Sequence, residues 1–386
     1  FDDTLSQEVE DAQLEVHRVD AKTPFHRLGS SGKKTGLITG KLAKYLRKIS
    51  RKIYFPDNKK GWIEPGIKKA SELIANKQID LIFSSAPPFS NHVIGEKLSK
   101  EFNIPLVVDY RDLFLGNHFE GKLSSSEFKR KLELEQRWLS EASGVIALDE
   151  YAASRISEIE KSVSPKVKVI PHGFDPADFE NTTDGTLQYK PGKLNWLYSG
   201  LFYEANQPDV FLKSWSKIIE TNPEIASNVH LHFQGGLDQR LKSLIKILNL
   251  QDIISDYGYV SHDVAVANLK KADVLWMISN FDAESKQIKS GKLFEYIGAQ
   301  KPILALVHSG EAQKLMEKYK AGWVASPSLV EDVTACIFSI YDGFKKGVFS
   351  EINMTLVQKH NRKNLTKELS TFFNEIVEHS YSEQNL

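Results

Sequence analysis

Two kinds of segment alternate along most of this 386-residue chain. Short continuous apolar runs, typical of strands buried on both faces, are separated by longer segments whose apolar residues recur at helical spacing. The first series of apolar runs covers residues 80–85, 105–109, 144–148 and 167–170, and the second covers 194–199, 229–234, 273–279 and 302–307. This alternation predicts an α/β protein with two parallel sheets, each doubly wound with helices on both faces.

A polar segment separates the two series. Residues 181–192 contain Asn-Thr-Thr-Asp-Gly and Pro-Gly, which favour turns and loops. We therefore predict a first domain over residues 1–180, a linker over 181–192 and a second domain over 193–361. Residues 362–386 follow as a separate segment, and most of it has the apolar spacing of a long helix. By periodicity alone such a chain could also be a kinase, a periplasmic-type binding protein or a dehydrogenase.

The start of the chain differs from this pattern. Residues 14–19 alternate apolar and polar side chains and predict a strand, but one too polar for the centre of a parallel sheet. The strand at residues 80–85 would then lack a partner on one side. We expect a strand–helix–strand unit upstream of Phe1 to complete the first sheet.

A basic segment follows. Residues 21–56 contain ten Lys or Arg and no Asp or Glu, and residues 41–53 place apolar side chains on one helical stripe. This helix could lie on an anionic membrane surface, or pack on the core with a solvated basic face. Over the whole chain fifty basic residues balance fifty acidic ones, so we expect no nucleic-acid partner. One cysteine, Cys336, excludes an internal disulfide, and we expect a cytoplasmic protein, either free or at the inner face of the cell membrane.

One predicted helix begins where a ligand is expected. It follows the apolar run at 273–279, with Ser290 as its N-cap and with Gly298 and Pro302 at its end. Its N-terminus would lie at the carboxyl edge of a parallel sheet, where free N–H groups and the helix dipole favour phosphate. Lys292 and Glu295 share one face of this helix. The lysine suits a phosphate and the glutamate a ribose diol, although a plain surface ion pair would have the same spacing.

Polar side chains also end the strands of the first domain. They are Ser85, His92, Asp109, Arg111, Asp112 and His172. Strand ends of this kind carry the sites of α/β proteins. The alternatives are structural: the two aspartates would cap a turn and pair with the arginine, and the two histidines would be a cap and a turn residue.

Several segments resemble one enzyme family. Residues 291–303, Gly-Lys-Leu-Phe-Glu-Tyr-Ile-Gly-Ala-Gln-Lys-Pro-Ile, resemble the donor-binding helix of the family-4 retaining glycosyltransferases. Further segments in the family's order are residues 82–92, 107–112, 170–175, 197–200 and 258–262. The resemblance implies the GT-B architecture, in which two Rossmann-like domains face each other across a cleft. It also implies that residues 362–386 form a helix that crosses back to the first domain.

The same resemblance implies roles for individual residues. The donor-binding residues would be Gly200, Tyr259, Val260, Gln287, Lys292, Leu293 and Glu295. Arg111 and Asp112 would position the reacting groups, while Ser85, His92, Asp109 and His172 would line the acceptor side of the cleft. Two features depart from the family. Gln287 stands where a glutamate is common, and the loop after Gly200 lacks the usual cations that clamp the diphosphate.

The function implied is transfer of a sugar, with retention of configuration, from a nucleoside-diphosphate sugar to a glycan or lipid-linked acceptor. The nucleotide would be UDP or GDP, the setting cell-surface polysaccharide synthesis, and no metal or other cofactor would be required. Two alternatives remain open. One is a sugar-nucleotide 2-epimerase on the same scaffold, and the other is a non-catalytic protein that binds nucleotide sugars.

Overall fold

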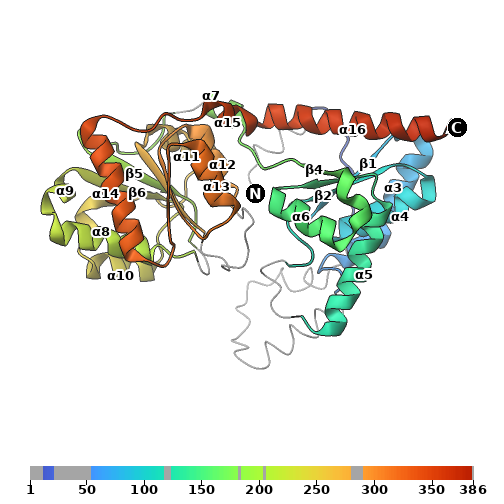
Figure 1. The fold of residues 1–386 in the computed structure, drawn as a ribbon, viewed down its shortest axis with the longest axis horizontal. Coiled ribbons are helices and arrows are strands. Elements are labelled where there is room, and N and C mark those ends of the chain that lie inside the picture. The colour runs from blue at the N-terminus through green and yellow to red at the C-terminus, as the bar shows by residue number, and fades with distance from the viewer. Residues whose placement is uncertain are drawn as a thin grey trace.

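The computed structural model describes residues 12–20, 54–116, 123–180, 184–202, 206–279 and 290–384. The expected membrane-binding segment 41–53 and Gln287 lie outside these residues. Within them the chain forms two α/β domains that lie side by side, with the long C-terminal helix running along the first domain (Figure 1). None of the described helices combines the length and apolar character needed to cross a bilayer.

The first domain has a parallel sheet in the order β1-β2-β3-β4. Its strands are β1 (Ile82–Ala86), β2 (Leu106–Tyr110), β3 (Gly144–Ala147) and β4 (Val167–Val169). Its helices are α3 (Ile63–Asn76), α4 (Ser90–Phe102), α5 (Ser125–Glu141) and α6 (Glu150–Ile159). One face of the sheet packs on an aromatic core that includes Phe89, Tyr110 and Trp138.

The other face of the first sheet is covered by α16 (Arg362–Gln384). The helix contributes Leu365, Leu369, Phe372, Phe373 and Ile376, which pack against Val107 and Ile146 of the sheet. Gly144 permits the close approach, because a Cβ at this position would lie 2.5 Å from Ile376 Cδ1. The prediction that the terminal helix crosses back to the first domain is therefore confirmed.

The strand predicted at residues 14–19 is wrong. This segment has no strand structure, and Leu14 and Val16 are exposed. Within the described residues β1 pairs with β2 alone, so it forms an edge of the sheet. The expected unit upstream of Phe1 stays a prediction.

The second domain has a parallel sheet in the order β7-β6-β5-β8-β9-β10. Its strands are β5 (Leu194–Ser199), β6 (Val229–Gln234), β7 (Ile254–Asp256), β8 (Val274–Ser279), β9 (Ile303–Val307) and β10 (Gly322–Ala325). This is the doubly wound order of a Rossmann-like domain, and the direction of winding reverses between β5 and β8. Ligands of such sheets bind outside the carboxyl ends of the strands at this switch point.

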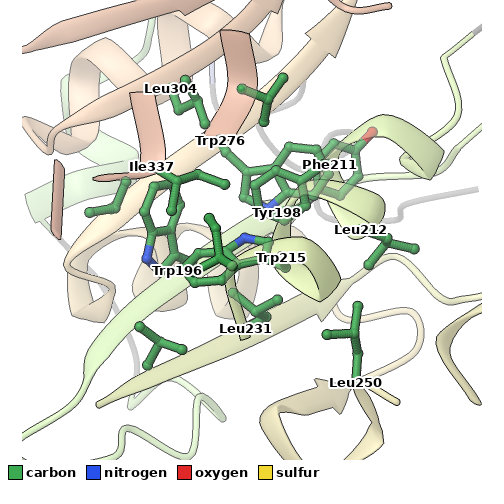
Figure 2. Close-up of a cluster of buried hydrophobic side chains, with 14 of the residues drawn as sticks. Trp196, Tyr198, Phe211, Leu212, Trp215, Leu231, Leu250, Trp276, Leu304 and Ile337 are labelled. Atoms are coloured by element: carbon green, nitrogen blue, oxygen red, sulfur yellow. The ribbon is translucent and has the colours of Figure 1, made fainter. Parts of the chain in front are cut away.

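Helices cover both faces of the second sheet. On one face α8 (Asp209–Thr221), α10 (Gln239–Ile247) and α14 (Val330–Lys346) enclose a core rich in tryptophan (Figure 2). On the other face lie α11 (His262–Lys271), α12 (Lys292–Ala299), α13 (Glu311–Tyr319) and α15 (Met354–Lys359). The described residues also include the short helices α7 (Pro176–Glu180) and α9 (Pro223–Ser227). The predicted fold class, two doubly wound Rossmann-like domains, is confirmed.

Two short segments connect the domains and are hydrogen-bonded to each other. The Phe174 N–H donates to His360 O at 3.0 Å, and the Arg362 N–H donates to Phe174 O at 2.9 Å. Gly173 allows this contact, because a Cβ there would lie 2.4 Å from His360 O. Leu365, just beyond this point, already packs on the first sheet. We call residues 172–174 and 360–362 the hinge.

The first domain ends earlier than the predicted boundary at residue 180. Phe174 lies in the core of the second domain, and Gly298 of α12 makes room for it, since a Cβ there would lie 2.5 Å from Phe174 Cγ. The predicted linker is also docked on the second domain over part of its length. The Leu187 N–H donates to Asn268 Oδ1 at 2.8 Å, and the Lys190 N–H donates to Asn195 Oδ1 at 2.9 Å.

Candidate donor-binding site

A rim of glycines borders the carboxyl edge of the second sheet. Gly200 follows β5, Gly235 and Gly236 follow β6, and Gly258 follows β7, and all four have positive φ angles. The turns after β5 and β6 touch, because a Cβ on Gly235 would lie 2.4 Å from Gly200 O. Only glycine combines these backbone angles with so close an approach. The rim therefore exposes backbone at the place where a doubly wound sheet binds its ligand.

Lys292 lies over the Gly200 turn. Its Nζ donates to Tyr198 Oη at 3.0 Å and lies 4.7 Å from the centroid of that ring. A Cβ on Gly200 would lie 2.0 Å from the same Nζ, so the ammonium group occupies the space that glycine leaves. Burial lowers the pKa of Lys292 to about 8, while the nearby Glu295 acts in the opposite direction. The site thus holds a partly desolvated cation against exposed backbone.

Glu295 lies one helical turn beyond Lys292. Burial raises the pKa of this carboxyl group, and the positive charges of His262 and Arg362 act against that rise. Within the described part of the chain Glu295 forms no hydrogen bond or ion pair, so its oxygens can accept from a ligand. Arg362 comes from the hinge, which places a residue of the crossover helix beside a residue of the second domain.

The helix that carries these residues differs in detail from its prediction. It begins at Lys292 with Gly291 at the N-cap and no capping side chain, so Ser290 is not its cap. It ends at Ala299, followed by Gln300 in the left-handed region, so Gly298 does not end it. Leu293 has no exposed surface and packs in the core, so its side chain does not face the site as expected.

An exposed aromatic ring stands at the far end of the rim. Tyr259 follows Gly258 directly and is 85% exposed, and Val260 beside it is half-buried. Its neighbour on the rim is close, since a Cβ on Gly236 would lie 3.9 Å from Gly258 Cα. A free ring at the edge of a glycine-lined surface can stack on a planar ligand.

A buried carboxylate marks the edge of the first sheet. One oxygen of Asp109 accepts from Ser85 Oγ at 2.7 Å and from Arg111 Nε at 2.8 Å. The other oxygen is buried and finds no hydrogen-bond partner among the described residues. Asp112 is half-buried in the turn after β2. The sequence-predicted residues Ser85, Asp109 and Arg111 thus form one cluster.

His172 lies between this cluster and α12. Its ring is 6.0 Å from the Phe294 ring in an edge-to-face arrangement. Burial lowers the pKa of His172 to about 4, and the charges of Arg111 and Arg362 add to the effect against that of Asp109. The imidazole is therefore neutral at physiological pH. Through His172 the structure brings the first-domain cluster and the helix of Lys292 and Glu295 to the same region.

His92 does not line a cleft. Its ring has no exposed surface and packs against Phe89 and Trp138 in the core, with Nδ1 2.8 Å from Ser84 Oγ. Burial lowers its pKa to about 3. The expectation of an acceptor-side role is corrected by this position, because the ring is enclosed in the core, where Nδ1 pairs with the serine and Nε2 has no hydrogen-bond partner among the described residues.

Sequence reasoning missed three features of the site. The first is Tyr198, just before the Gly200 turn, and the second is the glycine turn Gly235-Gly236 after β6. A pair of glycines directly after an apolar run is a recognisable signal for such a turn. Arg362 carried no signal, since it lies 67 residues after Glu295 in the sequence and joins it only through the crossover. In the described part of the chain no group of His, Cys, Asp or Glu side chains could hold a metal ion.

The fold defines a class: two Rossmann-like domains with parallel sheets have the GT-B architecture of glycosyltransferases. Residues 4–178 match the sequence model of Glycosyltransferase Family 4, which confirms the resemblance. No curated protein matches the chain in a sequence search.

Solved structures share the fold at low sequence identity. A glycosyltransferase from Rickettsia africae aligns with a TM-score of 0.63 and 15% identity over 97% of this chain and 88% of its own. HepE from Anabaena, in complex with UDP, aligns with a TM-score of 0.60 and 15% identity over 98% of this chain and 89% of its own. Sucrose-phosphate synthase from Thermosynechococcus elongatus aligns with a TM-score of 0.53 and 17% identity over 84% of this chain and 77% of its own. The family match and the fold support a glycosyltransferase function.

Proposed function

We propose that the protein is a retaining glycosyltransferase that moves a sugar from a nucleoside-diphosphate sugar to a glycan or lipid-linked acceptor in cell-surface polysaccharide synthesis. One observation carries the proposal. Lys292 is held against the Gly200 turn at the switch point of the second sheet, with an unpaired Glu295 one turn further along the same helix. A cation over exposed backbone at a helix N-terminus suits a diphosphate, and a free carboxylate suits the ribose diol.

In this proposal the donor lies along the glycine rim. The diphosphate contacts the Gly200 turn and Lys292, the ribose hydroxyls donate to Glu295, and the base stacks on Tyr259. HepE was solved with UDP, and a pneumococcal O-GlcNAc transferase with UDP and GlcNAc. UDP is therefore the first nucleotide to test, with GDP as the alternative.

Transfer breaks the bond between the anomeric carbon and the phosphate oxygen and forms a bond from that carbon to an acceptor oxygen. The acceptor attacks from the face of the leaving group, and its proton passes to the departing phosphate oxygen, so the configuration is retained. Lys292 and the dipole of α12 stabilise the negative charge that develops on the diphosphate. No metal is needed for this role.

The first domain supplies the acceptor side. Arg111 is fixed by Asp109, and together with Asp112 it positions the reacting groups. Neutral His172 lies between this cluster and the donor helix, where it can hydrogen-bond a sugar hydroxyl without adding charge.

The test is a panel of UDP- and GDP-sugars incubated with and without extracts of glycan and lipid-linked acceptors. A glycosyltransferase releases the nucleoside diphosphate faster when its acceptor is present, and the linkage formed can be read by NMR. Inversion at C2 of the donor sugar without an acceptor would indicate the epimerase. Binding with no conversion of any donor would indicate a non-catalytic protein and would contradict the proposal.

The proposed location is the cytoplasmic face of the membrane, reached through the basic segment 41–53. Liposome sedimentation tests it with anionic and neutral vesicles at low and high salt. Binding should need anionic lipid, weaken with salt and be lost when Lys44, Arg47 and Lys48 are changed to Glu. Binding that ignores lipid charge, or survives these changes, contradicts it.

A further inference from the structure

We propose that Tyr198 is a positioning residue that seats Lys292 over the Gly200 turn, aimed at the diphosphate of the donor. The inference rests on the proposed function, since it assigns a role within the donor site. It concerns a residue of β5 that contacts no predicted ligand directly and acts through the lysine.

The Tyr198 hydroxyl has a defined orientation. It donates its single proton to Leu201 O at 3.1 Å, so it meets Lys292 Nζ, at 3.0 Å, as an acceptor. The ammonium group also lies 4.7 Å from the centroid of the ring, within the range of a cation–π contact. One side chain thus holds the cation by two kinds of interaction.

The ring itself is firmly placed. Tyr198 stacks on Phe202 with centroids 4.1 Å apart and packs on Trp276 at 4.9 Å. Figure 2 shows Tyr198 among Trp276 and Phe211 in the core of the second domain, where its ring is 2% exposed. Close packing in this core holds the Tyr198 ring in one position.

Other groups of the described chain do not hold the lysine. No carboxylate of a described residue pairs with Lys292, and Glu295 influences it only through space. A lysine side chain that is not held samples many rotamers, and ordering it on binding has an entropic cost. Because Tyr198 already holds Lys292 in the free protein, the lysine is ordered before the nucleotide binds, and the site is preorganised. Tyr198 also gives the site a fixed cation where the loop after Gly200 has none in residues 201–208.

Tyr198→Phe is the variant that tests the proposal, because it keeps the ring and removes the hydroxyl. Affinity for UDP should fall about three- to tenfold, less than for loss of a direct hydrogen bond to a charged group, because Lys292 remains and only its positioning is lost. Affinity for uridine, which lacks phosphate, should not change. The pH at which UDP affinity begins to fall should also shift downward, because the lost acceptor stabilised the charged lysine. GDP and guanosine replace these probes if the panel selects GDP.

The matched control is Tyr319→Phe in the same domain. Tyr319 is fully buried, and its hydroxyl donates to Lys301 O at 2.9 Å, away from the rim. This variant should bind UDP like the wild type. In a Lys292→Ala background, Tyr198→Phe should have no further effect on UDP affinity, because the residue it positions is gone.

Several outcomes overturn the proposal. If Tyr198→Phe keeps its UDP affinity while Lys292→Ala loses affinity, Tyr198 does not position the lysine, and only the donor site itself is supported. Equal losses for UDP and uridine show a structural disturbance and refute positioning. Additive losses in the double variant do the same. Unchanged UDP affinity in Lys292→Ala refutes the donor site itself and therefore also the positioning role of Tyr198.

Discussion

Nucleotide affinity should fall as the pH rises through about 8, because Lys292 loses its charge in this range. Its pKa is lowered to about 8 from an ordinary value of 10.5 by burial beside Tyr198 and Gly200. A bound diphosphate favours the charged form and raises the pKa of the lysine. Binding above pH 8 is therefore coupled to uptake of a proton.

The size of the effect follows from the pKa. If the nucleotide-bound lysine stays charged, affinity falls by about tenfold for each pH unit above 8, or roughly 1.4 kcal/mol. The loss should then be about tenfold between pH 7 and pH 9 and about thirtyfold by pH 9.5. The stability of the nucleotide-free protein changes in the opposite direction and rises with pH. Between about pH 8 and 10.5 the folded lysine has lost a proton that the unfolded chain keeps, so the free energy of unfolding rises.

Isothermal titration of nucleotide between pH 7 and pH 9.5 measures this dependence. Starting at pH 7 avoids the second ionisation of the phosphate, near pH 6. Buffers with different ionisation enthalpies count the proton taken up. Lys292→Arg is the matched control, because arginine stays charged over this range and should give a flat profile. A flat profile in the wild type, or an equal slope in Lys292→Arg, would refute the assignment.

Three further predictions concern other parts of the molecule. Gly200→Ala should lower nucleotide affinity at least tenfold, because its Cβ would lie 2.0 Å from Lys292 Nζ, whereas Gly347→Ala, also at positive φ but with open space, should leave affinity unchanged. Asp109→Asn should lower the transfer rate roughly a hundredfold by loosening Arg111 while nucleotide affinity measured by titration stays the same; a parallel loss of both would contradict this division of roles. The pKa of His92 is about 3 in the folded protein, so the free energy of unfolding falls by about 1.4 kcal/mol for each pH unit below 6.5. Measured by urea unfolding, the His92→Gln variant should lose about 2 kcal/mol less of this free energy than the wild type between pH 7 and pH 5. An equal loss in both proteins would exclude this histidine as the cause.

The fold could be predicted largely from the sequence because parallel strands are buried on both faces. Runs such as residues 105–109 and 302–307 are continuous and apolar, and each became a strand within about one residue of its expected bounds. The prediction of a strand at residues 14–19 was wrong because an alternating apolar and polar pattern forms a half-buried strand only when a neighbouring strand pairs with it. The edge strand β10 was missed, since Gly-Trp-Val-Ala is too short to be distinguished from a turn.

In the second domain, side-chain pairs of the site could be predicted from spacing only where both residues share one element. Lys292 and Glu295 lie on one helix, so their spacing was enough to pair them. Tyr198 lies 94 residues away from Lys292 and reaches it only through the packing of β5 beside α12, which no local pattern contains. His92 failed for the opposite reason. A polar side chain after a strand suggests a site, but the His92 ring packs in the aromatic core as a neutral group, with one nitrogen hydrogen-bonded to Ser84.

The central claim is that Glu295 holds the ribose of a nucleotide donor. The most direct measurement is the coupling between Glu295→Gln and removal of the ribose hydroxyls, obtained by titrating both proteins with UDP and with 2′,3′-dideoxy-UDP, or with the GDP pair if the panel selects GDP. Each change alone should weaken binding about tenfold or more, as for hydrogen bonds to a charged group. If the carboxylate and the diol contact each other, the two changes together should cost little more than either alone. Losses that simply add, or a Glu295→Gln variant that binds the full nucleotide like the wild type, would contradict the account.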